Sequence, residues 1–156
     1  MGRIVERQEL LSEIESARDR GLTIALANGC FDLLHVGHVR YLQAAAAEAD
    51  LLVVAINADD SMRAIKGAGR PVMAARDRAE IVAAIEGVDF VVVFGERDVT
   101  ALIRAIRPDV HCKGTDYTTE SVPERDVVRA CGGRIAIVGD PKDHSTRDLI
   151  ATIRAR

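Results

Sequence analysis

Short apolar runs alternate along this chain with segments of helical pattern. A run such as FVVVF, rich in Val and apolar throughout, is typical of a strand buried on both faces, as in a parallel sheet. Five runs of this kind cover residues 22–28, 51–57, 90–94, 109–113 and 134–138. Helices are expected over residues 5–20, 36–49, 59–65, 74–86, 98–106, 124–131 and 146–154. The alternation predicts an α/β fold with a doubly wound, five-stranded parallel sheet.

Composition narrows the class of protein. A chain of 156 residues, 48% of them hydrophobic, is large enough to bury its own core as one domain. A net charge of -3, 3% aromatic residues and no Trp argue against a nucleic-acid-binding surface. Three cysteines without a CxxC motif indicate free thiols. With no signal peptide and no membrane-spanning apolar run, we expect a soluble cytoplasmic protein.

The segment with the most candidate functional residues is 23–41, TIALANGCFDLLHVGHVRY. It reads as a strand, a tight glycine turn and the start of a helix, with His35 and His38 on one side of its first turn. Gly37 lets an anion approach the backbone, where free N–H groups and the helix dipole favour it. We therefore predict a phosphate site. Metal ligation and two unrelated surface histidines are the alternatives, but no HExxH glutamate and no third ligand support a metal.

Basic residues follow in two further segments. Lys66 and Arg70 lie in KGAGRP, where they either clamp phosphates or form a solvated surface loop. This segment lacks GxGxxG, so a dinucleotide fingerprint is not supported. Arg78, in RDRAE, either reaches a phosphate or pairs in solvent with Asp77 or Glu80.

Polar groups also follow the later strands. Lys113, Gly114 and Asp116 either line a site or form an ordinary turn. Ser145 and Thr146 either hold a phosphate at a helix start or simply cap that helix. Ligands of such sheets bind beyond the carboxyl ends of the strands. We therefore expect one pocket to be shared by Asp59, Lys66, Lys113, Asp116 and Ser145.

Together these segments resemble the cytidylyltransferase-like nucleotidyltransferases. The resemblance runs from about residue 4 to 153 and rests on NGCFDLLHVGHVRYL, NADDSMRAIKGAGRP, RDRAEI, PDVHCKGTDY and STRDLI. Within the family it is closest to the adenylyltransferase domain of the bifunctional heptose-phosphate kinase/adenylyltransferases. It implies a Rossmann-like nucleotidyltransferase fold with an HxGH motif, formed by residues 1–156 as a single domain with residues 1–21 as its leading helix.

The resemblance also implies an activity. A nucleoside monophosphate would pass from an NTP, expected to be ATP carried with Mg²⁺, to a sugar phosphate such as heptose 1-phosphate, releasing pyrophosphate. A glycerol-3-phosphate-type cytidylyltransferase using CTP is one alternative, and a non-catalytic nucleotide-binding module is another. Because the sequence contains no kinase domain, we expect a separate kinase in the pathway. A homodimer is also expected.

Site residues follow from the same resemblance. The implied catalytic residues are His35, His38, Lys66 and Arg78. The implied nucleotide-binding residues are Asn28, Gly29, Phe31, Asp32, Gly37, Lys113, Gly114, Asp116, Ser145 and Thr146. Acceptor binding is implied for Asp59 and Arg70. The chain departs from the family pattern E-G-x-S-T-T at KDHSTR, where Lys142, Asp143, His144 and Arg147 change a loop that helps select the base and grip the triphosphate.

Overall fold

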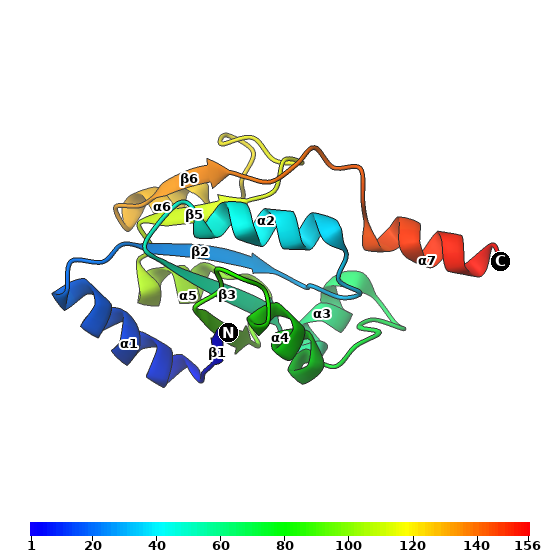
Figure 1. Cartoon of the computed structure of the whole chain (residues 1–156), viewed down its shortest axis with the longest axis horizontal. Coiled ribbons are helices and arrows are strands. Elements are labelled where there is room, and N and C mark those ends of the chain that lie inside the picture. Colours follow the sequence, from blue (N-terminus) through cyan, green and yellow to red (C-terminus); the bar gives the residue numbers. More distant parts are fainter.

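A computed structural model describes all residues, 1–156. Its centre is one sheet of six parallel strands in the order β1-β4-β3-β2-β5-β6 (Figure 1). The strands are β1 (Arg3–Ile4), β2 (Ile24–Gly29), β3 (Leu51–Asn57), β4 (Phe90–Phe94), β5 (Val110–Lys113) and β6 (Arg134–Ile137). The α/β class and the parallel sheet predicted from the sequence are confirmed.

The predicted count of five strands is wrong, because residues 3 and 4 add a sixth. This short edge strand pairs in parallel with β4, placing Arg3 opposite Phe90 and Ile4 opposite Val91. Two residues are too few to show a strand period, and both are exposed, so the segment has no apolar signature. The leading helix begins after it, at Arg7.

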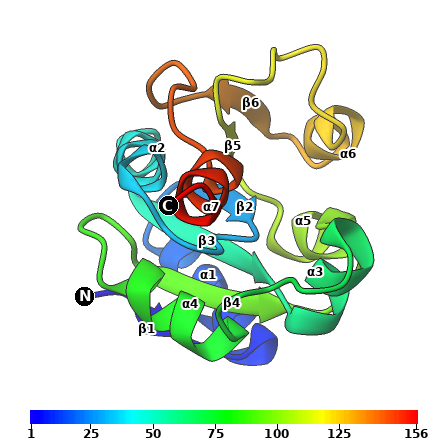
Figure 2. The ribbon, with the colours of Figure 1, turned by 90° about the vertical axis from the view of Figure 1, so that its right-hand side faces the viewer.

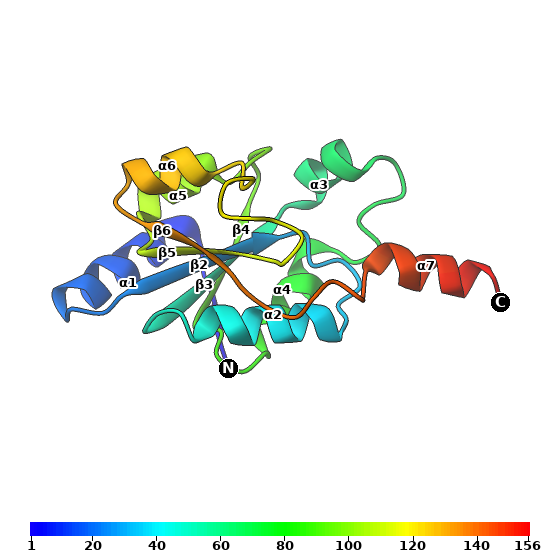
Figure 3. The same ribbon diagram turned by 90° about the horizontal axis from the view of Figure 1, so that it is seen from above.

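Helices cover both faces of the sheet. From above, α2 and α4 lie on one face and α1, α5 and α6 on the other (Figure 3). The helices are α1 (Arg7–Asp19), α2 (Val36–Ala46), α3 (Asp59–Lys66), α4 (Ala75–Ala83), α5 (Thr100–Ile106), α6 (Arg125–Ala130) and α7 (Thr146–Arg154). No helix combines the length and the apolar character needed to cross a membrane.

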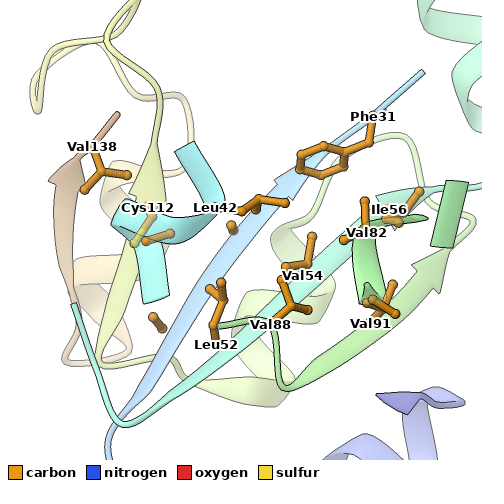
Figure 4. Packing of buried hydrophobic residues seen from close by; sticks show 14 of the residues in the cluster. Phe31, Leu42, Leu52, Val54, Ile56, Val82, Val88, Val91, Cys112 and Val138 are labelled. Atoms are coloured by element: carbon orange, nitrogen blue, oxygen red, sulfur yellow. The ribbon is translucent and has the colours of Figure 1, made fainter. Parts of the chain in front are cut away.

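Each face of the sheet has its own hydrophobic core. On one face Leu42 of α2 packs with Val54 and Cys112 of the sheet, all three fully buried (Figure 4). On the other face Leu10 of α1 packs with strand residues such as Leu26. Successive strand residues therefore enter opposite cores, which explains why the runs are apolar throughout. Burying each such side chain stabilises the fold by roughly 1.5–3 kcal/mol.

Strand order reverses at β2, which has β3 on one side and β5 on the other. In an open parallel sheet such a switch point leaves a crevice beyond the carboxyl ends of the strands. The β2–α2 turn lies at this end, and α7 projects from the same end, away from the body (Figures 1 and 2). Topology thus selects this end of the sheet for a site.

Candidate active site

A cleft of about 1200 Å³ opens at the carboxyl ends of the strands. Its walls come from the β2–α2 turn, the α3–α4 loop, the β5–α6 loop, the β6–α7 loop and α7. Single-ligand pockets are typically about 300–1,000 Å³, so this cleft has room for two substrates. Of the site residues expected from the sequence, all line the cleft except Asp59 and Arg78.

His35 and His38 lie at the start of α2 in a reciprocal cap. The Gly37 N–H donates to His35 Nδ1 at 3.1 Å, and the His35 N–H donates to His38 Nδ1 at 3.3 Å. The two ring centroids are 4.0 Å apart. Because each Nδ1 accepts a backbone N–H, each neutral ring carries its proton on Nε2. Both rings line the cleft, and neither Nε2 has a partner in the structure.

Both imidazoles are neutral near pH 7. Burial, and then the charges of His35 and Lys142, lower the pKa of His38 to about 4. Burial also lowers the pKa of His35, and His144 and Lys142 lower it further. A neutral ring with its proton on Nε2 donates a hydrogen bond without accepting a proton. The pair therefore suits oxygen atoms that gain negative charge during a reaction.

Gly37 makes room for the His35 ring. A Cβ at this position would stand 2.9 Å from Cε1 and 3.0 Å from Nδ1 of His35. The preceding turn is also constrained, since Phe31 and Leu33 adopt positive φ angles of 50° and 51°, which are uncommon for residues other than glycine. Contacts from elsewhere in the chain hold this conformation in place.

Asp32 is one of these contacts. Its carboxylate is buried and accepts hydrogen bonds from the N–H groups of Val72 and Met73 and from Arg70 Nε at 2.8 Å. Burial alone would raise the pKa of Asp32, but these donors outweigh it and lower that pKa. Asp32 and Arg70 both line the cleft, and their ion pair joins the β2–α2 turn to the α3–α4 loop.

Arg78 lies behind the cleft. It is fully buried and donates to the carbonyl oxygens of Met73, Cys30 and Asn57 and to Asp59 Oδ1 at 2.7 Å. Asp59 also accepts from the Ala75 N–H at 2.9 Å. The two residues thus bind each other and tie the β2–α2 turn to the end of β3 and the start of α4. Neither residue is among those that line the cleft.

At the carboxyl ends of β5 and β2, Lys113 and Asn28 share a part-buried polar network. Asn28 Oδ1 receives His111 Nε2 at 2.9 Å and Lys113 Nζ at 3.5 Å, and Lys113 Nζ also lies 3.4 Å from Glu124 Oε1. Burial, and then the charge of Lys113, lower the pKa of His111 to about 3. Because Oδ1 faces these donors, the amide N–H₂ of Asn28 is the group left for a ligand. Sequence reasoning missed His111 and Glu124, which lie on the network but not on the cleft.

Four cations line the cleft without an ion pair or side-chain hydrogen bond, namely Lys66, Arg97, Arg147 and Arg154. Sequence reasoning selected Lys66 and noted Arg147 only as a departure from a pattern. Arg97 follows the end of β4, a position that could have identified it. Arg154 ends α7 and gives no sequence signal. Unpaired cations around one cleft favour a strongly anionic ligand.

The hydroxyls of Ser145 and Thr146 are engaged within the protein. Ser145 Oγ caps α7 by accepting the Asp148 N–H at 3.1 Å and donates to Asp148 Oδ2 at 2.6 Å. Thr146 Oγ1 donates to the Asp32 carbonyl at 2.8 Å, which ties α7 to the β2–α2 turn. Both residues line the cleft, as do Gly29, Phe31, Gly114 and Asp116.

The structure contains no group of three or more His, Cys, Asp or Glu side chains arranged to hold a metal ion. A divalent cation that accompanies a nucleoside triphosphate would enter as part of the substrate. The basic and histidine residues that line the cleft bring it hydrogen-bond donors and positive charge.

Comparison with known proteins identifies related chains. Residues 26–150 match the family described as cytidylyltransferase-like. The chain is 45% identical over 150 residues to the bifunctional protein HldE of Syntrophotalea carbinolica, covering 96% of this chain and 31% of the relative. It is 44% identical over 154 residues to the bifunctional protein HldE of Bradyrhizobium sp., covering 98% and 31%. The chain thus spans about a third of the length of these curated relatives.

A solved structure shares the fold. It is the lipopolysaccharide core biosynthesis protein of Thermoplasma volcanium, with a TM-score of 0.68 and 23% identity. The alignment covers 78% of this chain and all of that one. At this identity the likeness concerns the fold alone.

Proposed function

The chain belongs to the cytidylyltransferase-like family, and from this premise we propose that it is an adenylyltransferase that acts on a sugar 1-phosphate of the heptose type. In this proposal an oxygen of the sugar phosphate attacks the α-phosphorus of ATP. One P–O bond forms there, and the bond from the α-phosphorus to the β-phosphate oxygen breaks. Pyrophosphate leaves with Mg²⁺, and the products are an ADP-sugar and pyrophosphate.

The attacking phosphate oxygen is already ionised, so the reaction needs no strong general base. It needs alignment of two anions and compensation of the negative charge that they bring together. A cleft with room for two ligands and four unpaired cations supplies both requirements. This favours nucleotidyl transfer over chemistry that depends on proton abstraction.

The paired imidazoles of His35 and His38 are the observation that carries the proposal. Their Nε2–H groups are unpartnered, and reciprocal backbone contacts fix the ring tautomers. We assign them to the α-phosphate oxygens as the five-coordinate state forms. Lys66, which lines the cleft from the end of α3, would neutralise the triphosphate or the attacking phosphate.

Most of the remaining site residues take one of three roles in this proposal. Asn28, Gly29, Phe31, Gly37, Lys113, Gly114 and Asp116 form the nucleotide side of the cleft, and Arg70 stands on the acceptor side. Asp32, Asp59 and Arg78 act as positioning residues, because their polar atoms bind the turn and its neighbouring loops. This assignment replaces direct phosphate contact by Arg78 and acceptor contact by Asp59.

Pyrophosphate release over a matrix of substrates tests the proposal. ATP and CTP are each combined with heptose 1-phosphate and with glycerol 3-phosphate. Turnover with ATP and the heptose phosphate supports it, and turnover only with CTP and glycerol 3-phosphate assigns the second activity instead. Nucleotide binding without pyrophosphate release from any pair would identify a binding module and refute catalysis.

A further inference from the structure

The loop from β6 to α7, residues 138–145, brings an unusual set of donors to the cleft. The two hydroxyls at its end have their protons committed, Ser145 to Asp148 and Thr146 to the Asp32 carbonyl. Neither can donate to a phosphate without breaking a contact that holds the start of α7. A polyphosphate in this part of the cleft must therefore find its donors elsewhere.

His144 and Arg147 flank the two hydroxyl residues, and both line the cleft. The Arg147 guanidinium makes no ion pair and no hydrogen bond within the protein. His144 Nε2 has one partner, Asp143 Oδ1 at 3.3 Å, and its ring is otherwise free to bind a ligand. The loop's other cation, Lys142, is already paired with Asp116 at 3.1 Å.

His144 also lies beside the histidine pair. Its ring centroid is 6.3 Å from that of His35, and its Cβ is 3.6 Å from where a Cβ on Gly37 would stand. The bond from Thr146 Oγ1 to the β2–α2 turn keeps the loop in this place. The His35 ring thus lies between those of His38 and His144, and Arg147 belongs to the first turn of α7.

We propose that His144 and Arg147 bind the β- and γ-phosphates of the nucleotide, in place of the hydroxyls of Ser145 and Thr146. His35 and His38 then act next to them, at the α-phosphate. The inference rests on the proposed function for the identity of the ligand. It assigns binding of the outer phosphates to an imidazole and a guanidinium that flank the two hydroxyl residues.

Equilibrium binding of ATP and AMP, measured by calorimetry without an acceptor, tests this assignment. Losing one charge-assisted contact to the outer phosphates should weaken ATP binding roughly ten-fold in His144→Ala and in Arg147→Ala. AMP binding should stay within about two-fold in both variants, because AMP lacks those phosphates. Arg129→Ala on α6, away from the cleft, controls for the loss of one positive charge.

Ser145→Asn provides the competing arm, since Asn also caps helices but lacks the hydroxyl. The proposal expects this variant to bind ATP within about two-fold of the wild type. The proposal is overturned if Ser145→Asn weakens ATP binding while His144→Ala and Arg147→Ala do not. It is also overturned if His144→Ala and Arg147→Ala weaken the binding of ATP and of AMP equally. The binding assay does not depend on turnover. A failed pyrophosphate assay would therefore refute the proposed function, whereas the roles of His144 and Arg147 would still be decided by the ATP and AMP affinities.

Discussion

Arg78 Nη2 donates to Asp59 Oδ1 at 2.7 Å, and this contact lies behind the cleft. Four acceptors surround one guanidinium that is fully shielded from solvent. In the β2–α2 turn, Phe31 and Leu33 adopt positive φ angles. Arg78 binds the carbonyl just before them, at Cys30, and the Asp32 carboxylate between them binds the α3–α4 loop. The β2–α2 turn is therefore held from behind by Arg78 and by the loop that Asp32 anchors.

Arg78→Met should destabilise the fold by about 2 to 4 kcal/mol, because three carbonyl groups and one carboxylate lose their donor. Urea unfolding measures the change. Arg76→Ala, on the same helix, removes only an exposed pair with Glu80 and should cost less than about 0.5 kcal/mol. Equal unfolding midpoints for the two variants would contradict the buried role of Arg78.

Gly37→Ala should reduce kcat about a hundred-fold, because the new Cβ displaces the His35 ring. Stability should change by less than about 1 kcal/mol, since Ala favours the helix. Steady-state kinetics and thermal unfolding measure the two effects. Gly95→Ala is the control, because a Cβ there meets nothing within 4 Å. Unchanged kcat in Gly37→Ala would argue against the placement of His35.

Lys66→Ala should lower kcat/KM roughly a hundred-fold, because an unpaired cation of the cleft is removed from a reaction between two anions. Arg63→Ala lies one turn earlier on α3, where Arg63 pairs in solvent with Asp60. This control should stay within about two-fold of the wild type. Similar losses in both variants would indicate a general charge effect and remove Lys66 from the site.

Stability should fall as the pH drops from 7 to 5. His38 and His111 have folded pKa values of about 4 and about 3, below the ordinary 6.5, so the unfolded chain binds protons that the folded chain does not. The loss is about 2 kcal/mol for each histidine and about 4 kcal/mol for the two together, and stability is fully present only above pH 6.5. Urea unfolding at both pH values measures it. Ring proton resonances of these histidines that titrate near pH 6.5 in the folded protein would contradict this account.

Local pattern predicted the strands well where burial is continuous. The runs at 51–57 and 90–94 match β3 and β4 at both ends. Both strands have helices or neighbouring chain on their two faces, so nearly all of their residues are buried and apolar. The edge strand at Arg3 and Ile4 has no such constraint, and it was not predicted. Its pairing depends on where β4 lies, which is a tertiary property.

The candidate site also combines residues that the sequence predicts with residues whose role depends on tertiary contacts. Residues that follow the carboxyl ends of strands, such as Lys113 and Asp116, could be assigned to the cleft from topology. The burial of Arg78 could not be predicted from the sequence, because its partners come from the β2–α2 turn, the end of β3 and the α3–α4 loop. Nor could spacing show that the hydroxyl protons of Ser145 and Thr146 are committed.

The fate of the α-phosphate tests the central claim most directly. ATP labelled at its α-phosphorus is incubated with Mg²⁺, heptose 1-phosphate and the protein. Nucleotidyl transfer predicts that the label appears in an ADP-sugar, with one pyrophosphate released for each labelled product. Label that stays in ATP, or that appears only in free AMP or ADP, would contradict the account.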